Sequence, residues 1–330
     1  MNLTQHHTGT EYIQHLKADD FSLQALKLYQ YQYANNSIYQ RFCQSLGKTP
    51  DKVHSLETIP FLPVSFFKSH AITCAKNIPE QWFESSTTTG TVPSRHYIHD
   101  ISVYEASLLQ GFQEFYGNPE NYAILGLLPG YLERPNASLV YMVRRLMELS
   151  QHAYNDFYLH DFQKLAAHLQ TLKKKQQPVL LIGVTFALLD FADRYSLALP
   201  NTIMIETGGM KGRKEEITRE EVHTILKSRF EGVQVHSEYG MTEMFSQAYA
   251  QQNGIFRPSS TLRVLVSDIH DPLDIQTTGT GRLMIMDLAN RDSCAFLATD
   301  DAGTVFTDHS FTVVGRIDYS ELRGCSLMVS

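Results

Sequence analysis

Cysteine is scarce in this sequence, and so is every feature that would point to secretion or to a membrane. The 330 residues hold four cysteines, Cys43, Cys74, Cys294 and Cys325, which lie far apart and form no CxxC pair. This excludes a disulfide framework or a cysteine zinc site and predicts a reducing, cytoplasmic location. The first ten residues lack the apolar core of a secretory signal, and no window approaches the length of a membrane span.

Positive charge is also in short supply. Lys and Arg number 28 against 35 Asp and Glu, a formal net charge of -7. Phosphate backbones select basic faces, so this balance argues against nucleic acid as a partner. The run of lysines at 173–175 predicts no more than a solvated helix end. The 14 histidines show no HExxH or comparable metal-binding spacing.

Apolar strand and helix patterns alternate through the middle of the chain. Helices are expected within 11–58, at 102–116, 139–149 and 161–175, and after Thr218, which forms a capping box with Glu221. Val103, Ala106, Leu109 and Phe112 are expected on one face of the second of these, and Val222, Ile225, Leu226 and Phe230 on one face of the last. Buried strands are expected at 123–128, 179–183, 202–205 and 232–236. This alternation predicts an α/β fold with a largely parallel sheet.

The texture changes at residue 254. Short strands at 262–266, 281–286, 295–299 and 311–314, with turn residues between them, predict an antiparallel sheet or small barrel. We therefore predict an α/β core over 1–253 and a smaller β-rich subdomain over 254–330.

Residues 84–94, ESSTTTGTVPS, are rich in hydroxyl side chains and almost free of apolar ones. Such a run is either a polar surface linker or a loop whose O–H and N–H donors surround a tetrahedral anion. It is not a P-loop of the GxxxxGK[ST] type, because no lysine follows Gly90. Two further glycine-containing turns, at 206–209 and 237–243, directly follow predicted strands. Sites in parallel sheets gather at such strand ends.

Four motifs, in this order, resemble those of the adenylate-forming superfamily over residues 60–325. Residues 85–90 resemble its phosphate loop, TSGTTG, with Thr87 in place of a glycine, and YGMTE at 239–243 matches YGxTE. Residues 299–303 resemble TGDxG, with Asp300 in place of the glycine. GRID at 315–318, followed by Arg323 and Gly324, resembles the hinge element GRxD…RG, one residue shorter. Within the superfamily, IPFLP at 59–63, ETGGMKGR at 206–213, HSEYG at 236–240 and RGC at 323–325 resemble the acyl-protein synthetases of bacterial luminescence systems.

This resemblance implies the large N-terminal domain of an adenylate-forming enzyme, in a chain that stops short of the family's mobile lid. It implies ATP-dependent activation of a carboxylic acid, a long-chain fatty acid, with release of pyrophosphate and with Mg²⁺ as cofactor. Acyl transfer to an enzyme cysteine follows, and an acyl reductase or a carrier protein is the implied partner.

The resemblance also implies the site residues. Those expected to bind ATP are Ser86, Thr88, Thr89, Gly90, Gly208, Gly209, Tyr239, Gly240, Asp301 and Arg316. Glu243 is expected to hold Mg²⁺ and Thr242 to contact the α-phosphate; without the resemblance, Glu243 reads as a carboxylate at a helix N-terminus.

Each nucleotide contact has a plainer alternative. Tyr239 offers a flat face to adenine, but a tyrosine at a strand end also packs into cores. Asp301 would accept hydrogen bonds from ribose, but it also fits a turn, and Asp300 leaves its assignment ambiguous by one position. Arg316 would reach ribose or phosphate, and a surface arginine is its alternative.

Cys325 is the expected acyl acceptor, with Arg323 nearby to favour its thiolate; otherwise it is a small apolar residue near a chain end. Lys211 or Arg213 would replace the lysine of the missing lid, a hypothesis from charge and position. Two other functions stay open: a ligase that delivers the acyl group to CoA or a carrier thiol in trans, and a non-catalytic nucleotide-binding scaffold.

Overall fold

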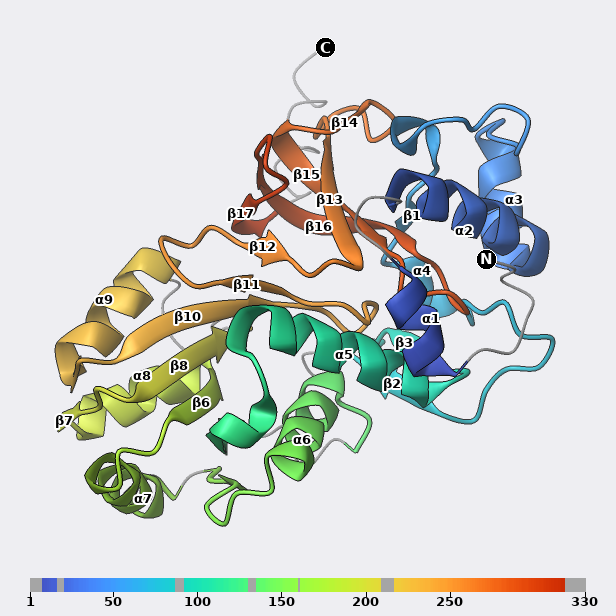
Figure 1. The fold of residues 1–330 in the computed structure, drawn as a ribbon. Coiled ribbons are helices and arrows are strands. Elements are labelled where there is room, and N and C mark those ends of the chain that lie inside the picture. Colours follow the sequence, from blue (N-terminus) through green and yellow to red (C-terminus); the bar gives the residue numbers. More distant parts are fainter. Residues whose placement is uncertain are drawn as a thin grey trace.

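The structure is a computed structural model that describes residues 8–16, 21–86, 92–129, 135–159, 161–208 and 217–317. Within this part of the chain, two large sheets are flanked by helices (Figure 1). The first sheet has seven strands in the order β12-β11-β10-β8-β6-β4-β5. The second has six, in the order β1-β16-β15-β13-β14, with β17 paired to β16.

The seven-stranded sheet confirms the predicted parallel core. Its strands are β4 (Ala123–Leu127), β5 (Asp156–Phe157), β6 (Val179–Val184), β8 (Thr202–Thr207), β10 (Gln234–Tyr239), β11 (Ala248–Ala250) and β12 (Arg257–Pro258). The first five pair in parallel, and β11 and β12 are antiparallel. Every residue of β4 and β6 is buried, as expected for a parallel sheet covered on both faces.

Helices cover both faces of this sheet. They are α5 (Ile101–Tyr116), α6 (Ser138–Ser150), α7 (Phe162–Lys174), α8 (Thr185–Arg194) and α9 (Arg219–Arg229), with the 3-10 turn η3 (Pro119–Asn121) after α5. Tyr116 of α5 is hydrogen-bonded to His236 of β10, and His223 of α9 to Ser237, the next residue of the strand. Adjacent strand residues point to opposite faces, so α5 and α9 lie on opposite sides of β10.

The capping box of α9 is confirmed. The predicted helix stripes are confirmed at Val103, Phe112, Val222, Leu226 and Phe230 and are wrong at Ala106, Leu109 and Ile225. Thr218 accepts from Glu221 N and donates its own N–H to the Glu221 carboxylate. On α9, Ile225 is 36% exposed, while Val222 and Leu226 are buried. On α5 the buried face runs through Tyr104, Ser107, Leu108 and Gly111 rather than through Ala106 and Leu109. Packing of Tyr104 against Phe83, Tyr141 and Phe245, and the hydrogen bond of Ser107 to Ser246, select that face rather than apolar period alone.

The six-stranded sheet contains the predicted antiparallel strands and one strand from far upstream. Its strands are β13 (Leu262–Ser267), β14 (Ile275–Gln276), β15 (Gly279–Asp287), β16 (Phe296–Val305), β17 (Phe311–Arg316) and β1 (Leu62–Pro63). β1 runs parallel to β16, with Leu62 opposite Leu297. The chain passes from the seven-stranded sheet to the six-stranded sheet between β12 and β13. The division into domains at residue 253 stays a prediction.

In its described residues, the predicted helical stretch 11–58 contains three helices and a 3-10 turn. The elements ahead of the first large sheet are α1 (Gly9–His15), α2 (Phe21–Asn35), α3 (Ser37–Ser45), η2 (Leu56–Thr58), α4 (Phe66–Ser69), β2 (Trp82–Glu84) and β3 (Arg95–Tyr97). A further short pair, β7 (Leu197–Ala198) and β9 (Phe230–Glu231), lies beside α9. Asn36 separates α2 from α3 by capping the latter: its side chain accepts from Ile38 N and Tyr39 N.

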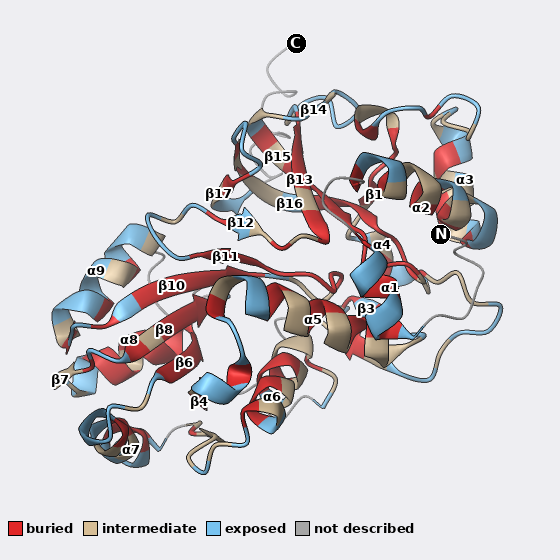
Figure 2. Cartoon of the chain, viewed as in Figure 1, coloured by how far each residue is buried: buried red, intermediate tan, exposed pale blue. Residues whose placement is uncertain are grey.

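Buried residues follow the strands of both sheets and the helix faces turned toward them (Figure 2). Of the helices described here, none combines the length and the apolar character needed to cross a bilayer.

Candidate active site

Three of the predicted loops meet at the carboxyl ends of β8 and β10. Gly208 follows β8 with a φ of +70°, and the 240–243 turn follows β10. The β2–β3 hairpin brings the hydroxyl-rich segment alongside, because His96 of β3 donates from Nδ1 to the Thr242 carbonyl at 2.9 Å. The ends of this segment are hydrogen-bonded to each other: Ser85 N donates to Ser94 O at 3.0 Å, and Ser94 N to Ser85 Oγ at 2.9 Å. The described ends of the segment are therefore held to each other and lie beside the YGMTE turn.

Glu243 is the buried carboxylate of that turn, with 7% of the residue exposed. Burial raises the pKa of its carboxyl, and a hydrogen bond from Ser94 and the charges of Lys68 and Arg316 act in the opposite direction. Ser94 is the last residue of the hydroxyl-rich stretch, Lys68 lies on α4, and Arg316 is on β17. Donors and cations from both halves of the chain thus converge on this one carboxylate.

Tyr239, Asp301 and Arg316 are also brought together. The Tyr239 hydroxyl donates to Asp301 Oδ2 at 2.8 Å, and Arg316 Nε lies 4.0 Å from Asp301 Oδ1. The Arg316 side chain is 88% exposed. The Tyr239 ring is largely buried and meets Phe256 and Phe311 edge-on, so it also has the core contacts of the plainer alternative. Its role toward adenine stays a prediction.

A polar network around Glu206, which the sequence did not predict, joins β8, α8 and α9. Glu206 Oε1 accepts from Arg219 Nε at 3.0 Å, and its Oε2 from the Thr185 hydroxyl at 3.0 Å. Thr185, the first residue of α8, also donates to Gly208 O at 2.6 Å. His223 Nε2 lies 3.8 Å from Glu206 Oε1. The network fixes the backbone on which the predicted 208–209 turn begins, and no local motif marks it.

A second set of missed residues holds the YGMTE turn from the side of the second sheet. The fully buried Asp287, at the end of β15, accepts from Phe245 N at 2.7 Å, Ser246 N at 3.0 Å and Ser246 Oγ at 2.6 Å. The amide of Asn290, also fully buried, donates to the Glu243 carbonyl at 2.7 Å. We call Asp287 and Asn290 the turn clamp. It leaves the Glu243 backbone little freedom, which orients the carboxylate.

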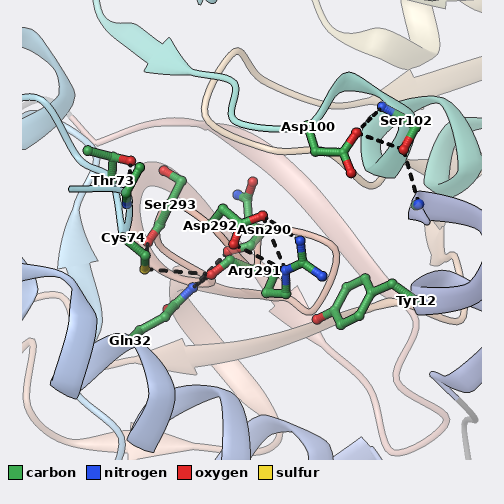
Figure 3. Close-up of polar contacts among 12 residues, drawn as sticks. Tyr12, Gln32, Thr73, Cys74, Asp100, Ser102, Asn290, Arg291, Asp292 and Ser293 are labelled. Carbon is green, nitrogen blue, oxygen red and sulfur yellow. Dashed lines mark hydrogen bonds and ion pairs between the residues drawn. The ribbon is translucent and has the colours of Figure 1, made fainter. Parts of the chain in front are cut away.

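Helices near the N-terminus hold the clamp in turn (Figure 3). Gln32 of α2 donates to Asn290 O at 2.7 Å and to Arg291 O at 3.0 Å, and its side-chain oxygen accepts from Ala295 N at 3.0 Å. Arg291 pairs with Asp292 at 2.8 Å and lies over the Tyr12 ring of α1. The segment that orients Glu243 is thus tied to α1 and α2.

Several predicted site residues lie outside the described residues: Thr88, Thr89, Gly90, Gly209, Lys211 and Cys325. The other three cysteines are described. Cys43 and Cys294 are fully buried, and Cys74 lies against carbonyls of the 291–293 segment. Burial raises the pKa of all three thiols, that of Cys43 to about 12.

The residues present fit a magnesium ion held mainly by substrate phosphates. In the described part of the chain, no group of three or more His, Cys, Asp or Glu side chains could hold a metal. Mg²⁺ in nucleotide sites is commonly bound by one or two carboxylates plus phosphate oxygens. Glu243, buried and hydrogen-bonded to Ser94, supplies such a carboxylate.

Comparison with solved structures identifies the class of fold. The chain is similar to ATP-bound MatB from Rhodopseudomonas palustris, with a TM-score of 0.54 and 14% identity over 73% of this chain and 49% of that one. It is similar to O-succinylbenzoate coenzyme A synthetase from Bacillus subtilis, solved with ATP and magnesium ion, with a TM-score of 0.50 and 11% identity over 73% and 51%. The chain thus has the fold of adenylate-forming enzymes and spans about half the length of these structures.

The family is narrower than the fold. The family described as "Acyl-protein synthetase, LuxE" matches residues 11–330, and the chain belongs to it. The chain is also 25% identical to the long-chain-fatty-acid–luciferin-component ligase of Vibrio harveyi, over 92% of this chain and 85% of that protein. The protein is therefore a ligase of the acyl-protein synthetase type, as the sequence motifs predict.

Proposed function

We propose that this protein activates a long-chain fatty acid with ATP, releases pyrophosphate, and transfers the acyl group from the adenylate to Cys325. The observation that supports this most is that Ser94, at a described end of the hydroxyl-rich segment, is hydrogen-bonded to the buried carboxylate Glu243 just after β10. Attack of a carboxylate on the α-phosphate joins two anions, so it needs charge neutralisation and alignment more than proton transfer.

The residues divide this work between them. Thr88, Thr89 and Gly90 would surround the β- and γ-phosphates, with Ser86 at the edge of the loop, and Thr242 would contact the α-phosphate. Mg²⁺, when bound, supplies positive charge to the phosphate oxygens, and Glu243 would hold it.

The nucleoside end would lie at the strand termini. Tyr239 and Gly240 on one side and Gly208 and Gly209 on the other would enclose adenine. Asp301 would accept from the ribose hydroxyls, and Arg316, within ion-pair distance of it, would reach ribose or phosphate. Lys211 would add charge at the phosphates. An acyl reductase or a carrier protein would then take the acyl group.

Cys325 is proposed as acceptor because the other thiols are poor candidates. Only the thiolate attacks readily, and burial makes Cys43, Cys74 and Cys294 weak acids. A thioester on the enzyme is also what acyl-protein synthesis requires.

The test is intact mass after incubation with ATP and fatty acids of several lengths, together with a pyrophosphate assay. Wild-type protein should gain one hydroxylamine-labile acyl group. Cys325→Ser should still form acyl-adenylate with one burst of pyrophosphate, yet gain no acyl group, because a hydroxyl is far less acidic than a thiol of pKa about 8.5. Acylation that persists in Cys325→Ser would contradict the assignment. Acyl transfer only to added CoA or carrier thiols would favour a ligase acting in trans.

A further inference from the structure

Glu238 is a buried carboxyl without a counter-ion, placed at the centre of the proposed site. It is the next-to-last residue of β10 and is 9% exposed. Across the sheet it lies opposite Thr207 on β8 and Tyr249 on β11. Among the described residues, Thr207 alone donates to it, through a short hydrogen bond to Oε2, and no lysine or arginine pairs with it. An isolated carboxylate is costly to bury, and groups kept in that state are candidates for function.

The carboxyl points toward the turns proposed to hold the nucleotide. A Cβ atom added at Gly240 would lie 2.5 Å from Glu238 Oε1, so this oxygen sits directly against the turn that leads to Thr242 and Glu243. The donor to the other oxygen, Thr207, immediately precedes Gly208. Glycine at 240 is therefore required for the carboxyl to reach this position between the two turns.

The titratable groups that the structure describes around Glu238 carry no positive charge that would stabilise its ionised form. Tyr104 and Tyr116 of α5 and Tyr249 of β11 face it, and each phenol is itself buried and un-ionised near neutral pH. Tyr104 donates to Ser138 O, and Tyr116 is bonded to His236, whose pKa burial lowers to about 4.

Further effects set its ionisation. Burial raises the pKa of the Glu238 carboxyl, the Thr207 hydrogen bond lowers it, and the charge of Glu206 on β8 raises it further; the result is a pKa of about 7.

The proposed reaction lacks one component, an acceptor for the thiol proton. A cysteine of ordinary pKa, about 8.5, is mostly protonated at neutral pH. We propose that Glu238 is the general base of the acyl-transfer step and that its Oε1 takes the proton of the acceptor thiol. The proposal rests on the proposed function, because it assumes an acyl-adenylate and a protein thiol.

The step balances without another reactant. Sulfur forms a bond to the acyl carbonyl carbon, and the bond from that carbon to the AMP phosphate oxygen breaks with its electron pair on AMP. The thiol proton moves to Glu238 Oε1 and is lost to solvent before the next turnover. A base whose pKa lies near the working pH is well matched to this task.

Rapid quench with labelled acid would follow acyl-adenylate and acyl-protein separately across a pH series, in wild type, Glu238→Gln and Thr207→Val. In Glu238→Gln we expect adenylate formation to be retained and transfer at neutral pH to slow by about 100-fold or more. Its pH profile should move from an inflection near 7 to that of the thiol itself, about 8.5. Thr207→Val removes the one hydrogen bond that lowers the Glu238 pKa, so its inflection should lie above the wild-type value while the rate at high pH is kept.

Equal slowing of both half-reactions in Glu238→Gln, or an unchanged transfer profile in either variant, would overturn the proposal. Thr207→Val keeps the carboxyl and the side-chain shape, so it tests the idea even if Glu238→Gln folds poorly. Failure of the proposed function looks different: the wild-type protein would then form no acyl-adenylate with any acid.

Discussion

Two buried glutamates, 32 residues apart in sequence, lie on adjacent strands with opposite electrostatics. Glu206 receives hydrogen bonds from Arg219 and Thr185. Burial alone would raise the pKa of its carboxyl, but His223, Arg219, Ser237 and Thr185 together hold that pKa below the usual range. Glu238 projects from the other face of the sheet and has Thr207 as its one donor. Glu206 is an ionised, paired carboxylate with a structural role, and Glu238 is a carboxyl whose pKa lies near neutral pH.

This contrast predicts opposite stability effects. The pKa of Glu238 is raised from 4.5 to about 7 on folding, so between these values the folded chain holds a proton that the unfolded chain has released. Stability contributed by that proton falls as pH rises through this window, by roughly 3 kcal/mol in total. Glu238→Gln should therefore gain stability relative to wild type between about pH 5 and about pH 8, measured by urea unfolding.

The matched control is Glu206→Gln. A depressed carboxyl pKa contributes stability that is present above the unfolded-state pKa and is lost as pH falls, so this variant should be less stable than wild type near neutrality. If Glu238→Gln and Glu206→Gln changed the free energy of unfolding in the same direction near neutral pH, the assignment of the two carboxyls would be wrong.

Glu243 carries the prediction about the metal. Glu243→Gln keeps size but removes the charge proposed to hold Mg²⁺, and adenylation should fall by orders of magnitude with the fold intact. Pyrophosphate release at saturating Mg²⁺ measures this. Glu231→Gln, an exposed carboxylate on β9, is the control and should behave as wild type. Near-normal activity in Glu243→Gln would remove this residue from the metal site.

At the scale of elements, the turn clamp holds the backbone of the turn that carries the proposed metal ligand Glu243. Asn290→Leu removes the amide that donates to the Glu243 carbonyl and so frees the turn. We expect a loss of about 1–3 kcal/mol in stability and a higher Mg²⁺ concentration for half-maximal adenylation. Asn36→Ser is the comparison: it keeps a residue able to cap α3 but loses the bond to Ser293 O in the same segment. It should lose stability with no change in Mg²⁺ dependence; an equal change in both variants would mean that the clamp is only structural.

Elements with a strong local signal were predictable from sequence. Short sequence patterns predict these elements: apolar runs predict β4, β6 and β8, and the capping box at Thr218 predicts the start of α9. The helix α8 was not predicted, because it is short and its first residues, TFALL, directly continue the apolar run of β6. The β2–β3 hairpin is also missed, since each strand has three residues and the segment between them is hydroxyl-rich.

The site shows the same limit. The motifs predict which loops assemble, but Glu238, Asp287 and Asn290 owe their roles to partners that are distant in sequence. Asn290 and the Glu243 carbonyl are separated by 47 residues, and the Ser246–Asp287 bond by 41. No pattern within either segment encodes such a pairing.

At the scale of the whole molecule, Arg219 links the two sheets. It pairs with Glu206 of β8, donates from Nη1 to Val313 O of β17 at 3.2 Å, and lies over the Phe256 ring. Arg219→Ala should therefore raise amide exchange at both the end of β8 and β17. In Arg229→Ala, at the other end of α9, the change should stay near Ala192, its hydrogen-bond partner. Exchange that rises at β8 alone in Arg219→Ala would argue against the link.

The ties between the N-terminal helices and the turn clamp also bear on how the protein is made. Gln32 and the carbonyl of Asn290 are 258 residues apart, and the Tyr12 hydroxyl and the Leu288 carbonyl are 276 apart. At translation rates of about 5–20 residues per second, α2 waits roughly 10 to 50 s on the ribosome before its partner segment exists. During that interval α2 can pack on its sequence neighbours α3 and η2, but Gln32 and Tyr12 lack their long-range partners. This protein should therefore depend on chaperones during synthesis more than an enzyme whose first helices pack only on their sequence neighbours.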